Sequence, residues 1–102
     1  MNMNIQNLMR EAQKMQKDLE KTNKELENTD YEGKSSFVTV VLNGNKEMKS
    51  LKIDFEDTLE GKEDMEMLED LIVVAYNDAS KKVDDDKKKK LGKYGNGLSG
   101  LM

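Results

Sequence analysis

The sequence contains no cysteine, no histidine and no tryptophan, and its only aromatic residues are three tyrosines and two phenylalanines. Without cysteine the chain can form no disulfide and can offer no thiolate to a substrate or to zinc. Without histidine it lacks the usual general base and the commonest transition-metal ligand. A divalent-ion site at Asp84–Asp86 is an alternative, but calcium loops spread their oxygens at alternate positions around a glycine turn. We therefore expect a protein that is not an enzyme and holds no metal or cofactor.

Proline and long apolar runs are absent as well. No segment approaches the roughly 20 apolar residues of a membrane-spanning helix, and the opening "MNMNIQNLMREAQ" lacks the apolar stretch of a signal peptide. We expect a soluble cytoplasmic protein with no membrane partner and no small-molecule substrate. With 102 residues, of which 35% are hydrophobic and 37% charged, the chain predicts one domain with a small core. Help from a partner subunit is expected.

The net charge is −4, and it is unevenly distributed along the chain. Residues 1–80 hold ten basic and eighteen acidic side chains, whereas residues 81–102 hold seven lysines and three aspartates. Such an asymmetry indicates an anionic partner for the positive end of the chain.

The segment from about Asn4 to Asn28 predicts one long amphipathic helix. Its apolar positions recur at spacings that alternate between three and four, so they share one face, with a polar lapse at Thr22. This face is the apolar seam: Ile5, Leu8, Ala12, Met15, Leu19, Thr22 and Leu26. Five basic residues fall opposite the seam, within a band about 80° wide. They form the cationic crest: Arg10, Lys14, Lys17, Lys21 and Lys24.

The middle of the chain predicts antiparallel strands. A short edge strand is expected around Tyr31 to Lys34, and Asn43-Gly44 supplies the turn of a hairpin that follows it. The first hairpin strand, from Phe37 to Leu42, is apolar on both faces: Val38, Val40 and Leu42 on one, Phe37 and Val41 on the other. One layer of helices cannot cover both sides of a sheet, so we expect a second, identical subunit to cover Phe37 and Val41.

A second helix is predicted to begin at Asp64, which is placed to cap it, and to end near Leu91. Its apolar surface widens around "LEDLIVVAY", where Val73 and Val74 lie well off the inner stripe. Together with Leu71, these two valines are candidates for the dimer interface. Residues 1–91 are thus expected to form one domain, and residues 92–102 a flexible, glycine-rich tail.

The run "DDDKKKK" near the end of this helix has a structural and a functional explanation. Three acid-before-lysine pairs at i,i+4 would keep a helix extension wound: Asp84–Lys88, Asp85–Lys89 and Asp86–Lys90. These pairs leave an excess of positive charge, because Lys81, Lys82 and Lys93 have no such partner among the three aspartates. The cationic crest also has a structural explanation, as the solvated face of an ordinary amphipathic helix. The spacing of its residues alone does not exclude that explanation.

Three segments match a known family in sequence and in spacing. They are "NLMREAQKMQKDLE", "VTVVLNGNKEMKSLKID" and "DMEMLEDLIVVAYNDASKKV", and they resemble the YbaB/EbfC family of small bacterial nucleoid-associated proteins from about Asn7 to Leu91. The third segment is the most specific, through Leu68-Glu69-Asp70-Leu71 followed by Ala75 and Asn77-Asp78-Ala79.

The resemblance implies an α+β protomer in the order α-β-β-β-α, with a three-stranded antiparallel sheet. It also implies a homodimer with projecting helical arms that bind double-stranded DNA in the nucleoid and organise it or regulate genes. The candidate DNA-binding residues are the cationic crest (Arg10, Lys14, Lys17, Lys21 and Lys24) and the lysines near the end of the second helix (Lys81, Lys82, Lys87, Lys88, Lys89 and Lys90).

The kind of cation predicts the kind of binding. Lysine binds phosphate as a point charge, whereas bidentate recognition of guanine is mostly the work of arginine, of which this chain has one. We expect binding that has little sequence preference and is weakened by salt. The alternative is a dimeric adaptor whose charged helices bind another protein, with DNA binding incidental.

Overall fold

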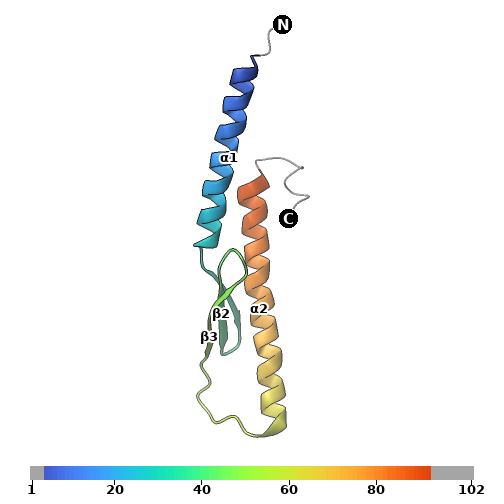
Figure 1. Cartoon of the computed structure of the whole chain (residues 1–102). Coiled ribbons are helices and arrows are strands. Elements are labelled where there is room, and N and C mark those ends of the chain that lie inside the picture. The colour runs from blue at the N-terminus through green and yellow to red at the C-terminus, as the bar shows by residue number, and fades with distance from the viewer. Residues whose placement is uncertain (1–3, 93–102) are drawn as a thin grey trace.

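The computed structural model describes residues 4–92 and contains two helices and three strands (Figure 1). In chain order they are α1 (Ile5–Glu27), β1 (Tyr31–Ser35), β2 (Val38–Leu42), β3 (Met48–Ile53) and α2 (Gly61–Leu91). The predicted order α-β-β-β-α and the α+β class are confirmed. Residues 93–102, which make up nearly all of the predicted tail, lie outside the described residues. Within residues 4–92 neither helix has a stretch apolar enough to cross a membrane.

The three strands form one antiparallel sheet in the order β1-β2-β3. Asn43 and Gly44 lie in the β2–β3 connection, as the sequence predicted, and β2 begins at Val38, one residue later than expected. The reason is the tight β1–β2 turn, in which Ser36 has a positive φ of 54°. Phe37 belongs to that turn, and its carbonyl accepts a hydrogen bond from the Asp54 amide at 2.8 Å.

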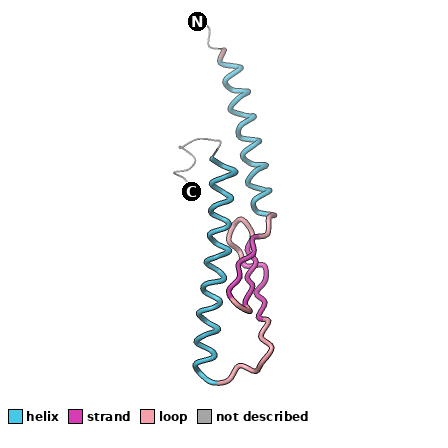
Figure 2. Tube along the Cα trace, turned by 180° about the vertical axis from the view of Figure 1, so that it is seen from behind, coloured by secondary structure: helices cyan, strands magenta, loops and turns pink. Residues whose placement is uncertain are grey.

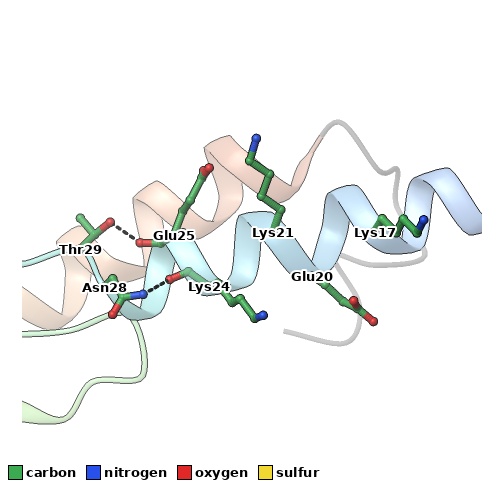
Figure 3. Close-up of a pocket in the computed structure, with 7 residues that line it drawn as sticks. All are labelled: Lys17, Glu20, Lys21, Lys24, Glu25, Asn28 and Thr29. Carbon is green, nitrogen blue, oxygen red and sulfur yellow. Dashed lines mark hydrogen bonds between the residues drawn. The ribbon is translucent and has the colours of Figure 1, made fainter.

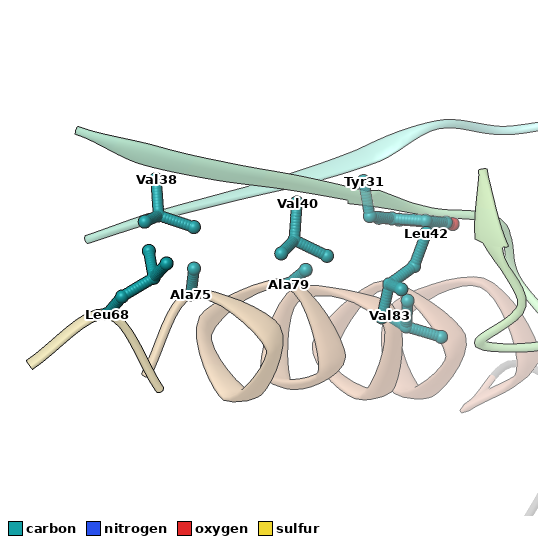
Figure 4. Packing of buried hydrophobic residues seen from close by; sticks show 8 residues of the cluster. All are labelled: Tyr31, Val38, Val40, Leu42, Leu68, Ala75, Ala79 and Val83. Carbon is teal, nitrogen blue, oxygen red and sulfur yellow. The ribbon is translucent and has the colours of Figure 1, made fainter. Parts of the chain in front are cut away.

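The core lies between α2 and one face of β1 and β2. Figure 4 shows Val38, Val40 and Leu42 pointing from the sheet toward Ala79 and Val83 of α2, and all five side chains are fully buried. The predicted inward face of β2 is therefore confirmed. The full cluster consists of Tyr31, Val38, Val40, Leu42, Leu68, Ala75, Ala79 and Val83.

Helix α2 lies unusually close to β1 because Gly33 has no side chain. A Cβ built at Gly33 would lie 2.1 Å from the Ala75 carbonyl oxygen and 2.5 Å from the Ala79 amide nitrogen. Small residues on both elements thus set the distance between the helix and the sheet. The same contact fixes where the rest of α2 runs.

The start of α2 corrects one prediction. Asp64 does not cap the helix: α2 begins at Gly61, with Glu60 in the N-cap position. The Asp64 carboxylate accepts a hydrogen bond from the Glu60 amide at 2.8 Å. Asp64 therefore satisfies a free amide from inside the first turn, as the second partner of a capping box does.

Helix α1 is attached only through its C-terminal part. Among the described helices and strands it contacts α2 alone, and its carbonyl at Leu26 accepts a hydrogen bond from the Gly44 amide at 3.0 Å. Of the apolar seam, Thr22 and Leu26 are buried. Figures 1 and 2 show that α1 and α2 overlap only near their C-termini, so that the first half of α1 projects past the end of α2. The molecule measures 75 × 21 × 14 Å.

Candidate nucleic-acid interface

The cationic crest is an exposed row of charge on the projecting helix. All five of its side chains are exposed, and α1 is a continuous helix over the whole row. At 1.5 Å per residue, the distance from Arg10 to Lys24 along the helix axis is about 21 Å. Because Thr22 and Leu26 of the opposite face are buried on the α2 side, the crest faces away from α2.

The ion-pair pattern separates the cationic crest from the other lysines. Within residues 4–92 every salt bridge involves a lysine outside the crest: Lys34, Lys46, Lys49, Lys62, Lys82 or Lys90. No acid of α1, all of which lies within the described residues, forms an ion pair with the crest, although Glu20 and Glu25 lie beside its lysines in α1. Helix α1 carries five acids as well as five basic residues, so the crest is a row of unpaired cations on a helix without net charge.

A shallow groove of about 660 Å³ lies at the C-terminal end of the crest (Figure 3). Two hydrogen bonds order its floor: the Asn28 side-chain amide donates to the Lys24 carbonyl at 2.9 Å, and the Thr29 hydroxyl donates to the Glu25 carbonyl at 2.6 Å. The Thr29 hydroxyl satisfies a carbonyl at the end of α1, and the Lys24 carbonyl accepts from the Asn28 backbone amide as well, at 3.1 Å. The residues around the groove are Lys17, Glu20, Lys21, Lys24, Glu25, Asn28 and Thr29.

The "DDDKKKK" run is organised differently from the prediction. Only one of the three expected i,i+4 pairs is present in the described part of the chain, Asp86–Lys90 at 3.1 Å. Asp84 instead pairs with Lys46 of the β2–β3 connection at 3.0 Å, and the Tyr31 hydroxyl donates to Asp86 at 2.5 Å. The prediction failed because i,i+4 spacing describes an isolated helix, whereas this segment lies against the sheet, whose partners compete for the carboxylates.

The lysines near the end of α2 divide into bound and unbound side chains. Lys82 donates to the Glu32 carbonyl at 2.6 Å and pairs with Asp78 at 3.6 Å, and Lys90 is held by Asp86. The other four form no salt bridge within residues 4–92: Lys81, Lys88 and Lys89, which are exposed, and Lys87, which is half-buried. A single chain does not join these lysines and the cationic crest into one surface, since the crest faces away from α2.

The Tyr31–Asp86 hydrogen bond is the buried polar link between β1 and the cationic end of α2. Burial, together with the hydrogen bond to Asp86 and the negative charge of that carboxylate, raises the pKa of Tyr31 to about 12. The same hydrogen bond lowers the pKa of Asp86, against a smaller opposing effect of its burial, and Lys90 adds to the lowering. The pair is thus most stable with a neutral tyrosine and an ionised aspartate.

This link predicts an alkaline loss of stability. A tyrosine ionises near pH 10 when unfolded and near pH 12 in the fold, so the free energy of unfolding should fall by about 3 kcal/mol across that range. Urea unfolding at pH 9, 10, 11 and 12 measures the change. Tyr31→Phe should remove it, whereas Tyr76→Phe, which deletes a half-buried hydroxyl elsewhere, should not. Equal slopes for the two variants would contradict the assignment.

The excess negative charge lies at the opposite end of the molecule. Residues 54–70 carry nine acidic side chains and one lysine, and they form the β3–α2 connection and the first turns of α2, far from the start of α1 (Figure 1). Within the described residues these acids form no group that could hold a metal ion. Their position explains how an acidic chain can carry a cationic surface.

The five predicted interface residues have different surroundings. Phe37 and Leu71 pack partly against the chain's own core, and the Phe37 ring lies 4.7 Å from that of Phe55. Val41 is half-buried. Val73 and Val74, by contrast, are 57% and 53% exposed.

Sequence reasoning missed a second apolar surface, on β3. Leu51 and Ile53 pair with Val40 and Val38, so their side chains share the face that α2 covers over β2. No contact joins α2 to β3, and Leu51 and Ile53 are 43% and 41% exposed. Only the position of α2 in the fold shows that this face of β3 is uncovered.

Three comparisons place the chain among known proteins. The profile of the YbaB/EbfC DNA-binding family matches residues 1–98. A nucleoid-associated protein of Streptococcus agalactiae serotype III is 40% identical over 94 residues, which are 90% of this chain and 93% of that protein. A nucleoid-associated protein of Xylella fastidiosa strain Temecula1 is 42% identical over 98 residues, which are 94% of this chain and 89% of that protein. The crystal structure of an uncharacterized Helicobacter pylori protein has a TM-score of 0.70 at 29% identity, covering 86% of this chain and 92% of that one.

Proposed function

The chain belongs to the YbaB/EbfC DNA-binding family, and from this premise we propose that it is a nucleoid-associated protein that binds double-stranded DNA. The cationic crest is the main contact surface. Its exposed cations, free of ion pairs within residues 4–92, are the observation that carries the proposal. Lys88 and Lys89 supplement them at the end of α2. The protein would act at the nucleoid, within the cytoplasm.

The chemistry of the crest supports binding through phosphates. Four of its five cations are lysines, which bind phosphate as point charges and carry little information about base sequence. No aromatic side chain lies among them to stack on a base. Duplex binding with little sequence preference follows from this composition.

A homodimer is the second part of the proposal. The exposed apolar side chains of β3 and α2 suit a second copy of the chain. Leu51 and Ile53 continue the sheet face that α2 covers over β2, and Val73 and Val74 add exposed apolar surface on α2. Sheets placed at the centre of such a dimer would leave the two α1 helices as projecting arms. Two arms raise affinity when both reach the same duplex. The proposed interface combines Leu51, Ile53, Val73 and Val74 with the half-buried Phe37, Val41 and Leu71.

The salt dependence of binding to unrelated duplexes tests the DNA contact. If the five crest cations of one arm each neutralise one phosphate, the log–log slope should be about −4.5, and affinity should fall roughly 500-fold between 50 and 200 mM salt. Electrophoretic mobility shifts with several random duplexes measure it. A slope near zero, or no binding at 50 mM salt, would instead favour a protein-binding adaptor.

Substitutions on the exposed apolar surface test the dimer. Leu51→Asp combined with Val73→Asp should convert the dimer to a folded monomer, because both side chains are about half exposed in a single chain and a buried interface excludes unpaired carboxylates. Sedimentation equilibrium measures the mass and circular dichroism the fold. Gln13→Asp, at an exposed position of α1 outside the proposed interface, is the control and should remain dimeric. A double variant that stays dimeric would place the interface elsewhere.

A further inference from the structure

The projecting half of α1 carries an apolar face that no described part of the chain covers. Ile5, Leu8 and Met15 of the apolar seam are 70%, 45% and 52% exposed, and Met9 beside them is 57% exposed. This half lies beyond the end of α2 (Figure 1). The seam is therefore one continuous stripe along α1. Its C-terminal part is buried near α2, and its N-terminal part, about 16 Å long, is uncovered.

The residues that flank the seam restrict what can cover it. In heptad terms, one flank carries Glu11 and Asp18 and the other carries Gln16 and Asn23. A second α1 helix packed antiparallel would set acidic flank against acidic flank. A second α1 packed parallel and in register would set Glu11 opposite Gln16 and Asp18 opposite Asn23, where each amide can donate to a carboxylate.

We propose that the open seam of α1 pairs, parallel and in register, with the open seam of an α1 helix that belongs to another homodimer. The cationic crest lies on the opposite side of α1, so two paired helices present their crests in opposite directions. Such a pair can hold one duplex on each side. The consequence for DNA rests on the proposed function, whereas the helix pairing itself does not.

The pairing is short and should be weak in free solution. About one and a half heptads of open seam give few apolar layers, and helical contacts of this length are marginal in water. DNA raises the local concentration of protein bound along it, and linkage of this kind can raise the apparent affinity by about 10² to 10⁴. The pairing should therefore be strongest on DNA, where it joins separate duplexes.

Single-cysteine substitutions test the pairing, because the chain has no cysteine of its own. A parallel, in-register pair sets position 8 opposite position 8, so Leu8→Cys should form a disulfide between chains under mild oxidation. Gln13→Cys is the matched control, since position 13 is also exposed but lies about 130° around the helix from the seam. The Leu8→Cys chain should cross-link at least about ten-fold faster than the control, and faster still with duplex DNA present.

Three outcomes would overturn the pairing. Equal rates for the two positions would show that the seams do not meet. A thiol at position 8 that reacts with a soluble maleimide but does not cross-link would show an uncovered seam. A thiol at position 8 that neither reacts with the maleimide nor cross-links would show that another segment of the same chain covers this position.

A bridging assay tests the consequence. Protein is added to a bead-bound duplex, and the recovery of a second, fluorescent duplex is measured. Leu8→Gln with Met15→Gln removes two seam side chains without changing charge. Binding to one duplex should stay within about two-fold, while recovery of the second should fall at least about ten-fold. Unchanged recovery would overturn bridging. If the wild-type protein binds no duplex, the proposed function is overturned instead. The helix pairing would then still be tested by the cross-linking of Leu8→Cys without DNA.

Discussion

Changing Lys14, Lys17 and Lys21 to glutamate should reduce duplex affinity at least about 10³-fold at 50 mM salt, with the dimer intact. The three substitutions remove the centre of the cationic crest and replace it with three repulsive charges on each arm. Since each phosphate contact contributes about −0.9 to the log–log salt slope, the slope should also become shallower by at least about 2.7 for each arm engaged. All three side chains are exposed, so the fold should not change. Mobility shifts across a salt series measure both quantities, and sedimentation equilibrium measures the dimer.

The control for this variant has the same net charge. Changing Lys34, Lys52 and Lys62 to glutamate alters three exposed lysines away from α1 and should reduce affinity by less than about ten-fold through the general field of the protein. If the two triple variants lose affinity equally, net charge rather than the crest determines binding. If the crest variant binds as the wild type does, the DNA contact lies elsewhere.

Gly33→Ala should destabilise the protein by about 3 kcal/mol or more. The new methyl group would lie 2.1 Å from the Ala75 carbonyl oxygen and 2.5 Å from the Ala79 amide nitrogen. Both are backbone atoms of α2, which can make room only if the helix moves away from the sheet and loosens the core. Overpacking of this kind typically costs about 1–3 kcal/mol and occasionally more. Urea unfolding at one protein concentration measures the difference.

Gly92→Ala is the matched control for this substitution. Nothing lies within 4 Å of a Cβ at Gly92, and its φ of −59° is open to any residue. We expect this variant to unfold within about 0.5 kcal/mol of the wild type. If Gly33→Ala were equally harmless, the spacing between α2 and β1 would not depend on the missing side chain.

Local patterns predicted most of the fold. The helical periodicity of α1, the alternation of β2 and the Asn43-Gly44 turn each depend on near neighbours in the chain, and the structure confirms them. Of the seam as a core-facing side, only Thr22 and Leu26 are buried.

The errors arose where a segment distant in sequence competes for the same carboxylate. Asp84 has a suitable lysine four residues away, yet it pairs with Lys46, 38 residues distant in sequence. Asp86 keeps Lys90 but also accepts a hydrogen bond from Tyr31, 55 residues distant.

The candidate site was predictable only in part. Periodicity identified the cationic crest as a row, because a row on one helix is a local property. Whether its charges are neutralised depends on where acids from the rest of the chain lie, and the sequence does not contain that information directly. The uncovered face of β3 was missed for the same reason, since α2 could have covered β2 and β3 as well as it covers β1 and β2.

Residues 54–70 hold nine acids and one lysine, whereas residues 81–92 at the other end of α2 hold six lysines and three aspartates, so each protomer carries an electric dipole along its length. In the field of a polyanion such a dipole experiences a torque that turns the basic end inward and the acidic end, residues 54–70, outward. Screening confines this torque to separations near the Debye length, about 10 Å at 0.1 M salt. Orientation is thus selected in the last step of each encounter, and lower ionic strength should raise the association rate constant as well as the equilibrium affinity.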